Sequence, residues 1–198
     1  EDVLSAWAGL RPLVQPEEGF SEAGAVSREF EIREGPTGVF TLSGGKLTSH
    51  RHMAEKTVDR LQQFLGRAGV SPTHKVDTAK TPLPGGTFDT LDALRTDVRA
   101  RADAYGVGRV SADRLTRAYG TRAYRVLELV KRRPELRRPI LEDRPHILAE
   151  ALYAVQNEFA LHVEDVLYRR TRIGLETRDK TAVAAQRIAN VMGTELGW

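Results

Sequence analysis

The sequence predicts an α+β protein that is mainly α, in which a short β-hairpin and a helix precede an all-α C-terminal domain. Apolar residues alternate with charged ones around Phe30 and Ile32, and a second apolar run follows at Phe40. After Gly45 the apolar spacing changes from two residues to three or four, which is typical of an amphipathic helix. Beyond residue 86 only helical spacing recurs, interrupted by glycines and prolines.

The hairpin is expected to turn within Glu34–Gly38, a segment rich in turn-forming residues. The following helix should end near Gly66 and Gly69. Its predicted inner face carries Leu47, Ala54, Val58, Leu61 and Leu65.

Three regions follow from this pattern. Residues 1–68 carry the strand signals and the first helix, and residues 87–198 form the predicted helical domain. Residues 69–86 contain three prolines and the pair Gly85-Gly86, which favours an ordered linker.

Five or six short helices are expected in the second region. Thr121 is a candidate cap of one helix, and Pro145 is a candidate first residue of another. The segment from Val163 either continues that helix or starts a new one. The predicted helices cover about residues 91–106, 111–120, 121–133, 145–159, 163–173 and 179–193.

The composition excludes several classes of protein. The 198 residues contain no cysteine, so disulfides, thiolate catalysis and thiolate metal sites are ruled out. The net charge of +3 comes from 24 arginines and 6 lysines against 27 acidic residues. Because acidic and basic residues are interleaved, the sequence lacks the concentrated basic stripe that favours nucleic-acid binding. No apolar run approaches the roughly 20 residues of a membrane-spanning helix.

The segment Phe40–Thr48, FTLSGGKLT, is the clearest candidate for a functional site. An apolar strand breaks at Gly44 and Gly45 and restarts as a helix, which presents free N–H groups and a positive helix end. Lys46 adds a cation, so a phosphate, a carboxylate or the electron-rich edge of a cofactor would suit the place. A nucleotide P-loop is excluded, since Phe40 and Leu47 stand where that motif needs Gly and Ser or Thr. The simpler alternative is a turn that only reverses the chain.

Several strings in register resemble the C-terminal part of the FAD-dependent glycerol-3-phosphate dehydrogenases and the related glycerophosphate oxidases. The resemblance covers nearly the whole chain, from Trp7 to Trp198. The strings are Ala6–Leu13 (AWAGLRPL), Ser27–Ile32 (SREFEI), Phe40–Thr48, Pro82–Gly86 (PLPGG), Tyr153–Ala160 (YAVQNEFA) and Asp165–Arg172 (DVLYRRTR).

The flavin fingerprint Gly-x-Gly-x-x-Gly is absent from these residues, and the sequence opens at Glu1 without an initiator methionine or a signal peptide. The resemblance therefore implies a C-terminal fragment. Its catalytic base would lie in the portion before Glu1, so no catalytic residue is predicted here. Alone, the fragment is expected to bind no FAD and to be inactive.

The resemblance also implies the site residues. Arg11 and Arg28 would hold the phosphate and hydroxyls of glycerol 3-phosphate, and a guanidinium fork suits a phosphate dianion. Lys46 would contact the substrate or the flavin. Gly44, Gly45, Lys46, Leu47 and Thr48 would lie against the pyrimidine side of the isoalloxazine. The alternative for each cation is a side chain that points into water.

The complete enzyme would oxidise glycerol 3-phosphate to dihydroxyacetone phosphate by hydride transfer to FAD, and a quinone or oxygen would accept the electrons. The expected location is the cytoplasm, with peripheral attachment to the inner face of the cell membrane and homo-oligomer formation both open. No metal site and no nucleic-acid partner are predicted. Structural or surface roles are assigned to the five histidines, His50, His52, His74, His146 and His162.

One alternative belongs to another class of protein, a stand-alone helical interaction module that could bind nucleic acid. Its support is the predicted pair of short helices across a tight turn, Ser111–Gly120 and Thr121–Val130, which has helix-turn-helix spacing. Against it, the second helix offers Leu127, Glu128 and Leu129 where polar groups that read bases would be needed.

Overall fold

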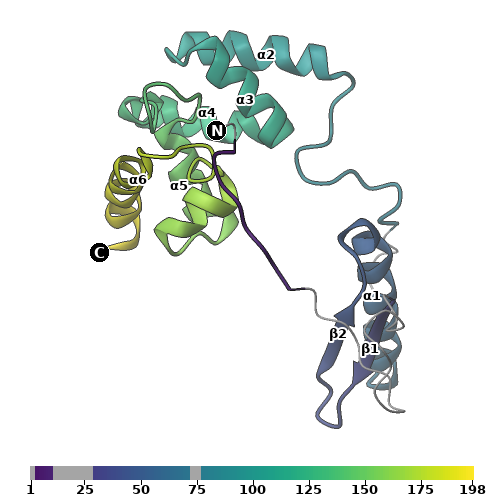
Figure 1. The fold of residues 1–198 in the computed structure, drawn as a ribbon. Coiled ribbons are helices and arrows are strands. Elements are labelled where there is room, and N and C mark those ends of the chain that lie inside the picture. The colour runs from purple at the N-terminus through teal and green to yellow at the C-terminus, as the bar shows by residue number, and fades with distance from the viewer. Residues whose placement is uncertain (1–2, 11–28, 72–76) are drawn as a thin grey trace. The chain divides into compact units, whose positions relative to one another are not determined.

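The computed structural model describes residues 3–10, 29–71 and 77–198. These residues form two compact units (Figure 1). One comprises Ala8–Pro82 with a two-stranded antiparallel sheet, and the other comprises residues 3–7 and Leu83–Trp198 and is helical. The α+β, mainly α fold predicted from the sequence is confirmed.

The small unit contains the predicted hairpin. Strand β1 (Phe30–Glu34) pairs antiparallel with β2 (Phe40–Gly44), so that Ile32 lies opposite Leu42. The turn closes through a 2.8 Å hydrogen bond from the Gly35 N–H to the Val39 carbonyl. The two strands pair with each other, as the predicted hairpin requires.

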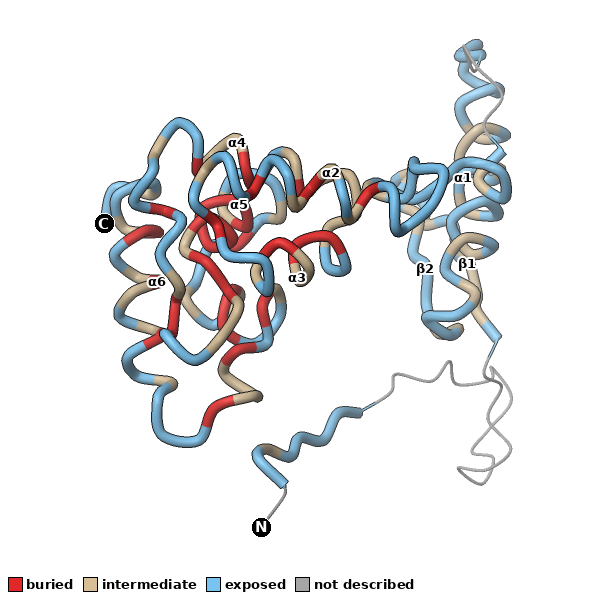
Figure 2. Tube along the Cα trace, turned by 90° about the horizontal axis from the view of Figure 1, so that it is seen from above, coloured by how far each residue is buried: buried red, intermediate tan, exposed pale blue. Residues whose placement is uncertain are grey.

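The helix of this unit packs only lightly on the hairpin. A 3₁₀ turn, η1 (Leu47–Ser49), leads into helix α1 (His50–Arg67). The rings of Phe40 and Phe64 meet edge to face with centroids 5.4 Å apart, and the rings of Phe30 and His52 meet at 5.8 Å. No described residue of this unit is buried, in contrast to the other unit (Figure 2). The predicted inner face of the helix is therefore only partly covered, and Leu47 is 87% exposed.

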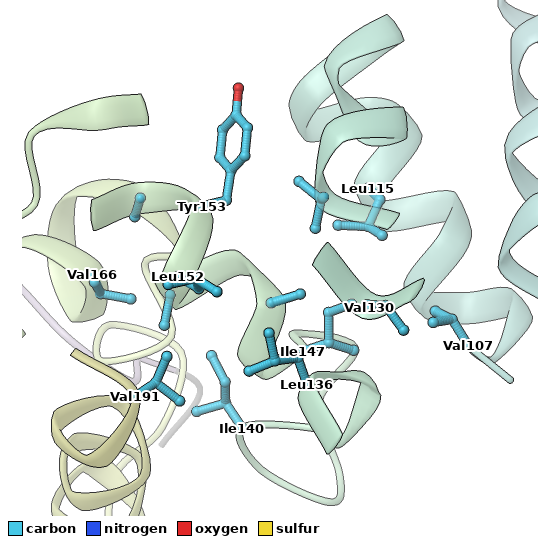
Figure 3. Packing of buried hydrophobic residues seen from close by; sticks show 14 of the residues in the cluster. Val107, Leu115, Val130, Leu136, Ile140, Ile147, Leu152, Tyr153, Val166 and Val191 are labelled. Atoms are coloured by element: carbon cyan, nitrogen blue, oxygen red, sulfur yellow. The ribbon is translucent and has the colours of Figure 1, made fainter. Parts of the chain in front are cut away.

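The helical unit has one continuous apolar core. Aliphatic side chains from several helices meet around Leu136, Ile140 and Ile147. Tyr153 also belongs to this core, with its ring pointing away from these three residues (Figure 3). No helix in the described part of the chain is long and apolar enough to cross a membrane. The elements are α2 (Leu91–Ala104), α3 (Arg109–Tyr119), η2 (Gly120–Arg122), α4 (Ala123–Arg132), η3 (Pro134–Arg137), α5 (Leu148–Glu158), the π-helix η4 (Asp165–Arg170) and α6 (Thr181–Leu196).

Three predicted helix ends are wrong. Thr121 lies inside the 3₁₀ turn η2 and caps nothing, because α4 begins after Arg122 without a side-chain cap. Pro145 lies three residues before α5, whose first turn is instead capped by a carboxylate from within the helix. Helix α6 does not end at Gly193, as predicted, but continues to Leu196. It ends there because the next residue, Gly197, adopts the left-handed conformation.

Two glycines join the segment after Pro82 to the helices. Gly85 (φ +95°) and Gly120 (φ +56°) meet backbone to backbone, and the Thr121 N–H donates a 2.9 Å hydrogen bond to the Gly85 carbonyl. A Cβ on either residue would overlap the backbone of the other segment. Residues 83–86 of the predicted linker therefore belong to the helical unit. Residues 3–7 group with it too, and the Val3 carbonyl accepts from Arg178 at 2.7 Å.

Candidate functional site

The strand–Gly-Gly–helix junction has the geometry that the sequence predicts. Gly44 and Gly45 both have φ of +77°, in the left-handed region that favours glycine. A Cβ on Gly45 would lie 2.6 Å from the Met53 sulfur, so the backbone must pass close to α1 here. The junction thus turns the chain sharply and sets the start of the helix.

The residues after the glycines are open to ligands. Lys46, Leu47 and Thr48 are exposed, and Lys46 is the residue before the first helical turn. The first N–H groups of a helix have no partner within the helix. No acidic residue lies in the first turn of η1 or of α1, so neither turn supplies a carboxylate of its own to the positive helix end. This arrangement can accept an anionic group.

The two predicted substrate arginines, Arg11 and Arg28, lie outside the described residues. The roles of Lys46 and of the junction in binding a substrate or cofactor remain predictions. His50 uses Nδ1 to donate to the Leu47 carbonyl at 2.9 Å, which is a local bond within the first helical turn. No group of three potential metal-ligating side chains occurs among the residues that the structure describes.

The helical unit holds a buried polar network that the sequence reading missed. Glu150, in the first turn of α5, is fully buried and forms an ion pair with Arg114 of α3. Its carboxylate also accepts from the Tyr119 hydroxyl and from the Ile147 N–H, both at 3.0 Å. A signal was present in the sequence, since Glu150 is the one acid within the apolar run Ile147–Val155.

Burial raises the pKa of Glu150 above its ordinary value. The Arg114 charge and the hydrogen bonds from Ile147 and Tyr119 act in the opposite direction. The same burial raises the pKa of Tyr119. Arg114 is therefore needed to keep the carboxylate charged inside the unit.

The comparison with known proteins supplies the family. The sequence profile of the C-terminal domain of alpha-glycerophosphate oxidase matches residues 76–198. The chain belongs to this family. The region matched covers nearly all of the helical unit and lies outside the junction at Gly44–Thr48.

Several glycerol-3-phosphate dehydrogenases align with this chain over its whole length. A protein of Caenorhabditis elegans named probable glycerol-3-phosphate dehydrogenase, mitochondrial, is 34% identical over 203 residues. A glycerol-3-phosphate dehydrogenase of Mycobacterium leprae is 34% identical over 197 residues, and the mitochondrial enzyme of Mus musculus is 33% identical over 201. Each alignment covers 100% of this chain but only 27%, 32% and 26% of the respective relatives. The chain thus spans about a third or less of the proteins it matches.

The segment Asp165–Arg172 forms structural contacts in this oxidase-family domain. Arg169 pairs with Asp165 at 2.8 Å, as the spacing predicts, although the turn is a π-helix. Arg170 donates to the Glu158 carbonyl from Nη2 at 2.6 Å and from Nε at 3.2 Å. The segment thereby holds the end of α5.

His146 is a buried histidine that must remain neutral. Its side chain is 2% exposed, and Nε2 lies 3.1 Å from the Thr171 carbonyl, so Nε2 carries the proton. Burial lowers the pKa of His146 to about 4, with Arg114 and Arg144 adding to the effect and the Thr171 bond opposing it. Among the described residues no side chain or backbone group bonds its Nδ1.

We expect His146 to make the oxidase-family domain sensitive to acid. Between about pH 6.5 and pH 4 the unfolded chain binds a proton at this residue that the folded chain does not, so stability falls as pH falls. The pKa difference corresponds to about 3–4 kcal/mol in total, of which about 2–3 kcal/mol should be lost between pH 7.0 and pH 4.5. Urea unfolding at pH 7.0 and pH 4.5 should show a smaller loss for His146→Gln, which can still donate to Thr171. An equal loss in both proteins would contradict the assignment.

Proposed function

We propose that the chain is the C-terminal part of an FAD-dependent glycerol-3-phosphate dehydrogenase. The complete protein would oxidise glycerol 3-phosphate to dihydroxyacetone phosphate and pass the electrons to a quinone or to oxygen. The main support is that glycerol-3-phosphate dehydrogenases align over 100% of the chain. In addition, the profile of the oxidase C-terminal domain matches residues 76–198.

The residues at the junction fit a flavin edge. Gly44 and Gly45 turn the chain with φ of +77°, and Lys46 to Thr48 are exposed beside the helix start. FAD, when bound, supplies a two-electron acceptor that gains negative charge on reduction. The Lys46 ammonium and the helix N–H groups would stabilise that charge. Arg11 and Arg28 would bind the substrate phosphate and so orient its C2 hydroxyl.

The stand-alone module is less well supported. The second helix of the predicted helix-turn-helix pair corresponds to α4, which buries Val126, Leu127 and Val130 in the core of the unit. These positions therefore stabilise the fold and are not available to a partner. The alignment over the whole chain also favours a role within a longer enzyme.

The junction can be tested in the full-length dehydrogenase. Lys46→Ala should slow flavin reduction by glycerol 3-phosphate in single-turnover experiments, because the lost charge matters most as the flavin becomes anionic. Lys56→Ala in α1 is a control, since Lys56 is exposed and forms a 3.8 Å ion pair with Asp59. An unchanged reduction rate in Lys46→Ala would indicate a lysine that only faces water.

The substrate arginines predict a different kinetic signature. Arg11→Ala and Arg28→Ala should each raise KM for glycerol 3-phosphate roughly ten- to hundredfold while FAD stays bound, since each removes a charge-assisted pair of hydrogen bonds to phosphate. Flavin absorbance checks cofactor retention in each variant. If either variant keeps the kcat/KM of the unmutated enzyme, that arginine does not bind the substrate.

A further inference from the structure

The loop after α5 exposes an aromatic side chain on the helical unit. Phe159 is 88% exposed, more than any other large hydrophobic residue within Leu83–Trp198. Leu161 is 56% exposed, whereas Ala160 between them is fully buried. The two apolar side chains therefore project outward on either side of a residue that anchors the loop. We refer to Phe159 and Leu161 as the apolar pair.

The backbone at Phe159 is unusual as well. Its φ is +53°, and Phe159 and Arg172 are the two non-glycine residues with positive φ in the described part of the chain. Glycine or asparagine is common at this position after a helix, because a larger side chain clashes with its own backbone. The sequence thus places a large apolar side chain where neither local conformation nor solvent favours it.

The loop holds this conformation through several bonds. The N–H groups of Phe159 and Ala160 both donate to the Ala154 carbonyl. The carboxylate of Asp165 accepts from the N–H groups of Leu161 and His162, both at 3.0 Å. Two hydrogen bonds from Arg170 to the Glu158 carbonyl hold the start of the loop, at the end of α5. The apolar pair is therefore presented on an ordered loop, as expected of a preformed contact surface.

We propose that the apolar pair docks into an apolar recess on the flavin-binding part of the complete dehydrogenase. This proposal rests on the proposed function above. The size of the relatives supports this occupant, since the chain accounts for only 26–32% of three of them and the remaining polypeptide is the larger part of each. The recess must be apolar because neither side chain of the pair carries a polar group.

Solvent exposure of Phe159 tests the docking directly. Hydroxyl-radical footprinting should oxidise Phe159 at least about fivefold more slowly in the full-length protein than in the 198-residue chain. Equal rates would overturn the proposal. So would a rate that falls with rising concentration of the short chain, which would indicate a second copy as the occupant. Protection of Phe159 in a full-length protein without dehydrogenase activity would keep the docking and reject the proposed function.

A substitution gives an independent test, because it should shift the midpoint of thermal unfolding in opposite directions in the 198-residue chain and in the full-length protein. In the short chain, Phe159→Asn should raise the midpoint of thermal unfolding by about 2–4 °C, because it relieves the left-handed strain at a side chain that is 88% exposed. In the full-length protein the same change should lower the midpoint. Arg172→Asn is the matched control, since it relieves the same strain without removing an apolar side chain, and it should raise both midpoints. Destabilisation of the short chain by Phe159→Asn, or equal gains in both proteins, would overturn the proposal.

Discussion

Gly120→Ala is expected to destabilise the helical unit by about 3–5 kcal/mol. The new Cβ would meet the Gly85 backbone, with the Gly85 carbonyl carbon only 2.8 Å away, and alanine is disfavoured at φ +56°. Backbone cannot give way as the end of a flexible side chain can. Relief would require the 83–86 segment to leave α3 and break the bond to Thr121.

The other end of α3 provides the control. Gly108 precedes the helix with φ of −61°, and no atom lies within 4 Å of a Cβ built there. Gly108→Ala should cost no more than about 1 kcal/mol, the usual effect at this position. Urea unfolding of both variants would check the prediction, and equal losses would show that the contact between the two glycines does not determine stability.

Arg114→Met should cost about 3–5 kcal/mol at pH 7, because it leaves Glu150 fully buried without its cation. The carboxyl would then bind a proton to avoid an unpaired charge. Protonation is easier at lower pH, so the cost of the substitution should shrink between pH 7 and pH 5. Chemical unfolding of both proteins at the two pH values measures this difference.

A second ion pair, which also involves α3, is the control for burial. Arg99 of α2 binds Asp113 of α3 through two bonds of 2.6 and 2.7 Å, but the two side chains are 32% and 24% exposed. Arg99→Met should therefore cost much less than Arg114→Met, since water can replace the lost partner. Similar costs for the two variants would mean that burial does not set the strength of the Arg114–Glu150 pair.

Much of the fold could be predicted because its signals are local. The hairpin follows from the alternation at Phe30 and Ile32 and from the turn residues between the strands, and the helices follow from apolar spacing. The strings shared with glycerol-3-phosphate dehydrogenases gave the family, which the oxidase-domain profile confirms. The junction glycines also have the conformation that their position implied.

The helix ends were predicted less well because caps depend on three-dimensional contacts. Pro145 was expected to begin α5, yet the helix starts at Leu148 after the Glu150 carboxylate caps the Ile147 N–H. The Thr121 N–H instead donates to the carbonyl of Gly85, a residue 36 positions earlier in the sequence. No local pattern specifies a partner at that distance.

By itself the sequence determined the fold class, the family and the candidate residues of the junction, since each depends on residue type and spacing along the chain. Only the tertiary structure decided that Glu150 is paired with Arg114, that His146 is buried and that Gly85 meets Gly120. These features arise where segments far apart in sequence pack together. The free energy of a charge or of a Cβ then depends on which neighbours replace water, and spacing does not contain that information.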